Sequence, residues 1–149
     1  MTCEKDWIDV LGAFGPFIVS IGTFVVAYRQ WLESQKTRKH LQSERYERLL
    51  NDLEKAMQNF GSFYVINQEN LNGFISVRNE AQKFAAEKII SLAQTILSKA
   101  LTIKKLDTKL DAQKDIEKRI EITEEREKIA AQLIELDIVK PFRAYLYLD

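Results

Sequence analysis

The chain of 149 residues is poor in the residue types from which most active sites and metal sites are made. It has one cysteine, Cys3, and therefore no internal disulfide. It has one histidine, His40, and no Cys/His spacing typical of a metal site. No glycine-rich phosphate loop is present either. These absences predict a protein that is not an enzyme and that carries no metal or cofactor.

Residues that break helices are also scarce. There are five glycines and two prolines, Pro16 and Pro141, and both prolines lie towards the ends of the chain. Leu, Ile, Lys, Glu, Gln and Ala dominate between them, and these residues favour helix. The sequence therefore predicts an all-α fold. Acidic and basic residues balance at 22 each, which argues against a dedicated nucleic-acid binder.

A long uncharged run is the most prominent feature of the sequence. Residues 10–28, VLGAFGPFIVSIGTFVVAY, contain no charged side chain, and Trp7, Tyr28 and Trp31 flank them. As a helix this run is roughly 28 Å long, close to the ~30 Å hydrocarbon core of a bilayer. A cleaved signal peptide and a buried core helix are the alternatives. The acidic leader MTCEKDWID is unlike the basic start of a signal peptide, so we favour a single transmembrane helix.

The charges that flank this run predict its orientation. Arg29, Lys36, Arg38 and Lys39 follow it, with only Glu33 of opposite sign among them. The positive-inside rule then predicts a bacterial inner-membrane protein with its N-terminus outside and its C-terminal domain in the cytoplasm. With His40, the four basic residues form what we call the cationic collar. It is interpreted as a topology determinant that contacts anionic lipid; in a ring of subunits it would select anions or attract RNA.

The expected membrane helix has two unlike faces at about 100° per residue. Bulky apolar residues lie on one side and suit lipid. Small and hydroxyl residues on the other side allow close helix approach and interhelical hydrogen bonds. Because a lone helix has no partner within its own chain, we expect homo-oligomers, with this surface as the oligomerisation or pore face; the alternative is a plain anchor that happens to be rich in glycine. The small-residue face comprises Gly12, Gly15, Val19, Ser20, Gly22, Thr23 and Val26.

The sequence predicts three regions along the chain. These are a tail and membrane helix over residues 1–30, a helical neck over 31–60 and a cytoplasmic helical domain over 61–149. The neck should continue the membrane helix and end in an amphipathic or coiled-coil seam of Tyr46, Leu50, Leu53, Met57 and Phe60. Asn70, Asn72 and Gly73 are typical of a turn. Two long helices are expected to follow, at about 74–101 and 107–136. Pro141 should end a helix. The aromatic residues Phe142, Tyr145 and Tyr147 that follow it should dock on the bundle or on a neighbouring subunit.

Two segments resemble a known class of proteins. The stretch AYRQWLESQKTRKHLQSERYERL and the ending KPFRAYLYLD are similar to small single-span bacterial membrane proteins, among them the membrane accessory protein of type VI-B CRISPR systems. The resemblance implies a homo-oligomeric, pore-like assembly that depolarises the inner membrane during phage infection, beside an RNA-guided nuclease. Those proteins are linked to a HEPN-like motif of Arg, four to six residues and His. Here the corresponding positions before His40 are Glu33, Ser34 and Gln35, so the motif is absent.

Together these patterns predict a homo-oligomeric inner-membrane protein that forms a pore or permeabilises the bilayer, in antiphage defence. The alternative is a membrane-anchored adaptor whose helical domain recruits a cytoplasmic partner.

Overall fold

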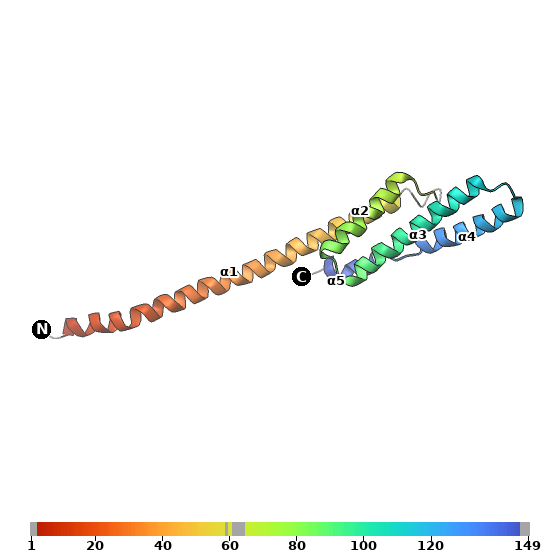
Figure 1. Cartoon of the computed structure of the whole chain (residues 1–149). Coiled ribbons are helices and arrows are strands. Elements are labelled where there is room, and N and C mark those ends of the chain that lie inside the picture. The colour runs from red at the N-terminus through yellow and green to blue at the C-terminus, as the bar shows by residue number, and fades with distance from the viewer. Residues whose placement is uncertain (1–2, 59, 61–64, 147–149) are drawn as a thin grey trace. The chain divides into compact units, whose positions relative to one another are not determined.

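The computed structural model describes the backbone of residues 3–58, 60 and 65–146, and the side chains of these residues from 19 onward. All regular secondary structure in this part of the chain is α-helical, as expected. The helices are α1 (Cys3–Gln58), α2 (Gln68–Phe84), α3 (Glu87–Ala112), α4 (Ile116–Ile134) and α5 (Lys140–Leu146) (Figure 1).

The chain divides into two compact units, residues 1–41 and 42–149. The backbone of α1 is continuous through both, which agrees with the expected continuation of the first helix into the neck. No helix within the described residues has a stretch long and apolar enough to cross a membrane. The first part of the expected membrane helix, residues 10–18, lies outside the described side chains.

In the second unit, α3 is the central helix. It packs against α2 and α4 along their lengths and also contacts α5; Figure 1 shows α3 and α4 side by side as a hairpin. The end of α1 adds the expected seam to this core. Tyr46, Leu50, Leu53 and Phe60 are buried and Met57 is partly buried, which confirms that pattern.

The expected turn at Asn70–Gly73 is wrong, because these residues form the first turns of α2. Asn67 caps this helix: its Oδ1 accepts from the Asn70 amide at 2.7 Å, and Asn70 Oδ1 accepts in return from the Asn67 amide at 3.3 Å. This reciprocal capping box supplies the amide partners that the start of a helix lacks. Gly73 allows α2 to pack closely on α1, because a Cβ at this position would lie 2.9 Å from the Ala56 Cβ of α1.

The expected single helix over 74–101 is also wrong, since it is broken at Ala85 and Ala86, both in extended conformation. The amide of Ala86, which starts α3, donates to the Tyr46 hydroxyl at 3.1 Å. A side chain of α1 therefore binds the backbone amide just before α3, whereas Ala86 itself has no side chain that could cap the first turn of α3. The periodic apolar residues still face the core: Phe74, Val77, Ala81, Ile89, Ala93, Ile96 and Ala100 are buried on the two sides of the break.

The last expected boundaries shift in the same way. Residues 107–112 continue α3, and α4 begins only at Ile116, after Asp115, whose carboxylate accepts from the Glu117 amide at 3.1 Å. Pro141 lies in the first turn of α5 and does not end a helix, because a residue without an amide hydrogen is tolerated there. Phe142 is fully buried and Tyr145 packs on the core, as expected of the tail, while Tyr147 lies outside the described residues.

Candidate functional site

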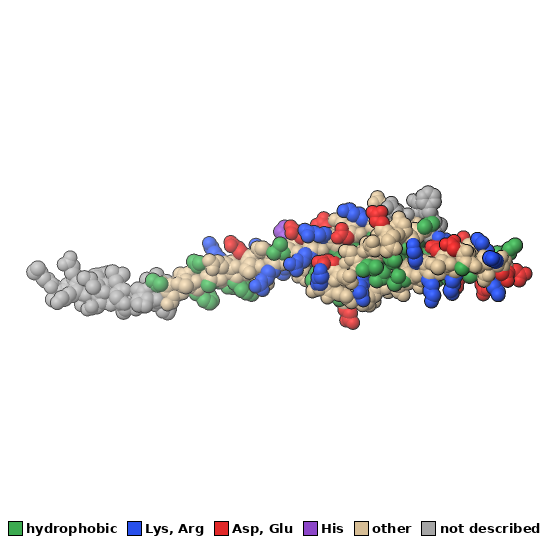
Figure 2. Space-filling view, turned by 45° about the horizontal axis from the view of Figure 1, so that its top comes forward, with side chains coloured by type: hydrophobic (Ala, Val, Ile, Leu, Met, Phe, Trp, Pro, Cys, Tyr) green, Lys and Arg blue, Asp and Glu red, His purple; other side chains and the backbone are tan. Residues whose placement is uncertain are grey.

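An apolar stretch of α1, residues 19–32, is left uncovered, and we call it the apolar segment. Its large side chains range in exposure from 39% at Leu32 to 72% at Phe24. In Figure 2, hydrophobic side chains lie open along this part of the helix. The exposed set comprises Val19, Ile21, Phe24, Val25, Val26, Tyr28, Trp31 and Leu32.

The apolar segment has the two faces that the sequence predicted. At about 100° per residue, six of its large side chains share one half of the helix; these are Ile21, Phe24, Val25, Tyr28, Trp31 and Leu32. The other half carries Val19, Gly22, Thr23 and Val26, together with Arg29 and Gln30 near the end of the segment. The Thr23 hydroxyl donates to the Val19 carbonyl at 2.8 Å, so its hydrogen-bonding need is met within the helix. Ser20, between the two halves, is exposed as well.

Gly22 is the glycine of this face whose surroundings the structure describes. A Cβ built at Gly22 meets no atom within 4 Å, so a larger side chain fits there as far as this chain is concerned. Gly12 and Gly15 lie outside the described side chains. The described part of the predicted face is therefore an open surface, and any effect of bulk at Gly22 would have to come from another molecule.

Two aromatic side chains end the apolar segment. Tyr28 and Trp31 stack with ring centroids 6.0 Å apart and an interplanar angle of 23°, and both are more than half exposed. Amphipathic rings of this kind are enriched at the boundary between membrane and water.

The cationic collar follows directly. Arg29, Lys36, Arg38, Lys39 and His40 are all exposed on α1. Within the described part of the chain none of these five side chains forms a salt bridge. The structure thus arranges them around a solvated helix and does not gather them into a pocket.

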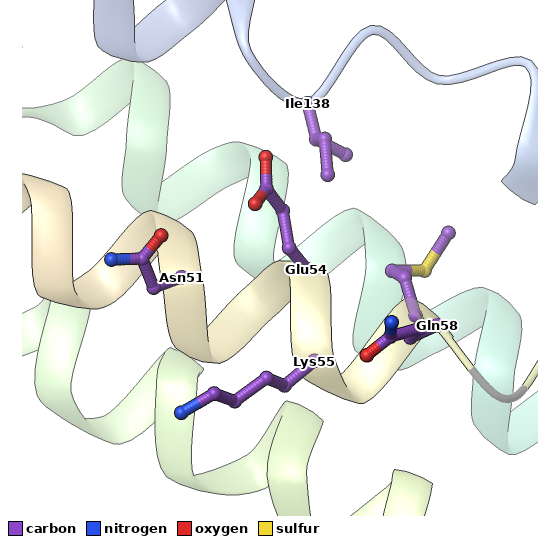
Figure 3. Close-up of a pocket in the computed structure, with 6 residues that line it drawn as sticks. Asn51, Glu54, Lys55, Gln58 and Ile138 are labelled. Carbon is purple, nitrogen blue, oxygen red and sulfur yellow. The ribbon is translucent and has the colours of Figure 1, made fainter.

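A surface depression lies in the other unit, near the end of α1 (Figure 3). Asn51, Glu54, Lys55 and Gln58 of α1 line it with Met57, and Ile138 from the connection between α4 and α5 closes one side. Glu54 extends towards Ile138 and Lys55 points away from it. The lining residues include neither a nucleophile paired with a base nor a metal cluster; no group of three metal-binding side chains occurs among the described residues.

One feature was missed by sequence reasoning. Tyr46 was expected only as one core residue, but its ring contacts Phe84, Phe142 and Tyr145 and its hydroxyl accepts from the Ala86 amide. Ile116 and Ile120, in the charged stretch at the start of α4, are 74% and 55% exposed.

Comparison with known protein families, with curated proteins and with solved structures finds no match to this chain.

Proposed function

We propose that the chain is a single-span inner-membrane protein whose copies associate through the small-residue face and permeabilise the bilayer. The observation that carries the proposal is the apolar segment, whose eight large apolar side chains are all exposed. Exposed apolar surface of this extent on one helix is typical of a surface that a partner or a membrane covers. Residues 10–18 extend the same uncharged run to a length that suits a bilayer.

The order of residues along α1 supports the membrane boundary. Apolar side chains end at Leu32, the stacked Tyr28 and Trp31 lie just before this end, and the cationic collar surrounds and follows it. A transmembrane helix that leaves the bilayer on the cytoplasmic side shows the same order: apolar residues first, then interfacial aromatic residues, then basic residues. The acidic leader before residue 10 fits the outer side.

Self-association is supported by the contrast between the two halves of the apolar segment. In lipid, bulky side chains gain nothing from leaving acyl chains, whereas small residues let two backbones approach closely. Gly22 has open space around it, so its surface is available to a second copy. The resemblance of residues 27–49 and 140–149 to small CRISPR-associated membrane proteins is the support for a role in antiphage defence.

The span and its orientation can be tested with the single cysteine of the chain. In intact spheroplasts, a membrane-impermeant maleimide should label Cys3 from outside. The matched control is Ser34→Cys in a Cys3→Ser background, since Ser34 is exposed in the neck; it should be labelled only after lysis. Labelling of both sites in intact cells, or extraction of the protein by alkaline carbonate, would exclude the membrane helix.

The assembly can be tested with Gly22→Leu. Because nothing within the chain lies near this position, the variant should insert normally but lose close helix contact. We expect the detergent-solubilised particle to shrink towards a monomer, and dye release from vesicles to fall roughly tenfold, as a loss of about 1.4 kcal/mol per interface predicts. Val25→Leu, on the bulky half, should behave as wild type. A wild-type particle that is already monomeric contradicts the pore.

A membrane-anchored adaptor is the second candidate, and exposed Ile116 and Ile120 favour it. Large apolar side chains in the open are typical of surfaces that bind other proteins. They are surrounded by Lys114, Arg119 and Glu124, so the surface has a polar rim. The two functions differ in a purified system: a pore releases dye by itself, whereas an adaptor inserts without releasing any.

A further inference from the structure

The short C-terminal helix α5 is attached to α1 mainly through one aromatic ring. Tyr145 stacks on Tyr46 with centroids 4.6 Å apart and an interplanar angle of 28°. Phe142 meets the same ring edge-on at 6.4 Å and is fully buried. Stacked and edge-on pairs of this kind are favourable beyond the area that they bury.

A hydrogen bond adds a second attachment near the boundary between the two units. The Ser43 hydroxyl donates to the Leu146 carbonyl at 3.2 Å. Ser43 is the second residue of the unit that begins at Gln42. The last turn of α5 is therefore hydrogen-bonded to the first turn of α1 that belongs to this unit.

Tyr46 also holds the junction between α2 and α3. Its hydroxyl accepts from the Ala86 amide at 3.1 Å, and its ring meets Phe84 edge-on at 5.5 Å. One side chain is thus shared between α5 and the start of α3. When α5 leaves, Tyr46 loses the ring stacked on it, and its hydroxyl is held less firmly against Ala86.

Besides these contacts, α5 touches α3, Leu146 is partly buried against the core, and Asp137 accepts from the Lys140 amide at 2.9 Å, but the helix itself is short. It has seven residues, fewer than an isolated helix needs for stability in water. Phe142 is its one fully buried side chain. Residues 135–139, which connect it to α4, form no regular helix. Segments with few buried contacts open well before a domain unfolds as a whole.

We propose that α5 is a latch: it opens and recloses without unfolding of α3 and α4, and its opening is transmitted through Tyr46 to the α2–α3 junction. The inference concerns residues 42–149 alone and does not depend on the proposed membrane function. It makes the C-terminal helix a switch, since anything that displaces α5 loosens a junction that is distant in sequence.

Hydrogen exchange of the full chain in detergent, resolved to single amides, tests this latch. In the wild type, the amides of Tyr145 and Leu146 should exchange faster than that of Ile103, which is fully buried in α3. Tyr145→Ala should speed exchange in α5 and at Ala86 by the same factor, roughly tenfold, and leave Ile103 unchanged. Arg143→Ala, an exposed change on α5, is the matched control and should alter none of these rates.

Tyr46→Phe provides an independent arm, because it keeps the stacked ring and removes the hydroxyl. In this background Ala86 should already exchange fast and should no longer respond to Tyr145→Ala, while α5 still does. The latch is refuted by α5 exchanging at the rate of Ile103. It is refuted equally by Tyr145→Ala affecting α5 alone, or accelerating all three sites alike.

Discussion

α2 approaches α1 closely at Gly73. The effect of Gly73→Ala on the stability of the fold should therefore change sign when the neighbouring Ala56 is replaced by glycine. Gly73→Ala would place a Cβ 2.9 Å from the Ala56 Cβ, whereas methyl carbons normally lie at about 3.5–4.0 Å. Neither group can rotate away, so α2 has to move by roughly 0.6 Å or more. That movement also strains the buried hydrogen bond from Asn70 Nδ2 to the Ala56 carbonyl, which is 2.8 Å long.

The two opposing terms can be compared. Overpacking of this kind costs about 1–3 kcal/mol. Replacing a glycine inside a helix by alanine gains about 1 kcal/mol of helix propensity. Because Ala56 is rigid and nearby Asn70 is buried, we expect the first term to win, with a net destabilisation of up to about 2 kcal/mol.

Ala56→Gly removes the methyl group that causes the clash. The nearest remaining atom of residue 56 would be its Cα, 3.7 Å from the new Cβ, which is ordinary contact. In this background Gly73→Ala should therefore stabilise the protein by up to about 1 kcal/mol. The double-mutant cycle should give a coupling energy of about 2 kcal/mol, within the range known for residues in contact.

Urea unfolding of the full chain in detergent, followed by far-UV circular dichroism, measures these effects. With a slope of about 1–3 kcal/mol per molar urea, a change of ~1.5 kcal/mol moves the midpoint by roughly 0.5–1.5 M. If Gly73→Ala stabilised the wild type, or had the same effect in the wild type and in the Ala56→Gly background, the proposed close packing would be refuted.

Three further predictions use the same assay. Asn67→Ala removes the cap of α2 and should cost about 1 kcal/mol, while Asn72→Ala, exposed on the same helix, should cost nothing. Tyr46→Phe leaves the Ala86 amide without its partner and should cost about 1–2 kcal/mol; Tyr28→Phe, at an exposed position, should leave the unfolding midpoint unchanged. Asp107→Asn weakens the ion pair to Arg126, which joins α3 to α4 and in which the arginine side chain is largely buried. This change should lower the free energy of unfolding by about 1–2 kcal/mol. Asp111→Asn, at an exposed position of α3, should leave it unchanged.

The core could be predicted from the sequence wherever a periodic pattern was buried as a whole. The seam from Tyr46 to Phe60 and the apolar positions from Phe74 to Ala100 were assigned from spacing alone, and the structure buries most of them. Spacing identifies these positions because the apolar residues on the buried face of a helix recur with the period of the helix, whichever element covers that face.

The breaks between helices were not predictable in the same way. Alanine has the highest helix propensity, so nothing local marks Ala85 and Ala86 as a junction. The break is accompanied by tertiary contacts, since α2 folds back on α3 and the Tyr46 hydroxyl accepts from the Ala86 amide at the junction. The Asn-rich start of α2 shows the opposite error: Asn67 and Asn70, spaced as in a capping box, carried a helix signal that the turn propensity of Asn70–Gly73 obscured.

The exposure of apolar side chains along α1 provides the argument that joins fold and function. From Val19 to Leu32 the large apolar residues are exposed, Leu41 is exposed alone, and from Tyr46 onward the large apolar residues that face the bundle are buried. A single helix therefore passes from a part whose apolar surface this chain does not cover to a part whose apolar surface it covers well. Burial of apolar surface is worth about 25 cal/mol per Å², so the first part needs a different medium from the second. In the proposed function, lipid would cover the bulky half and a second copy would cover the half that carries Gly22.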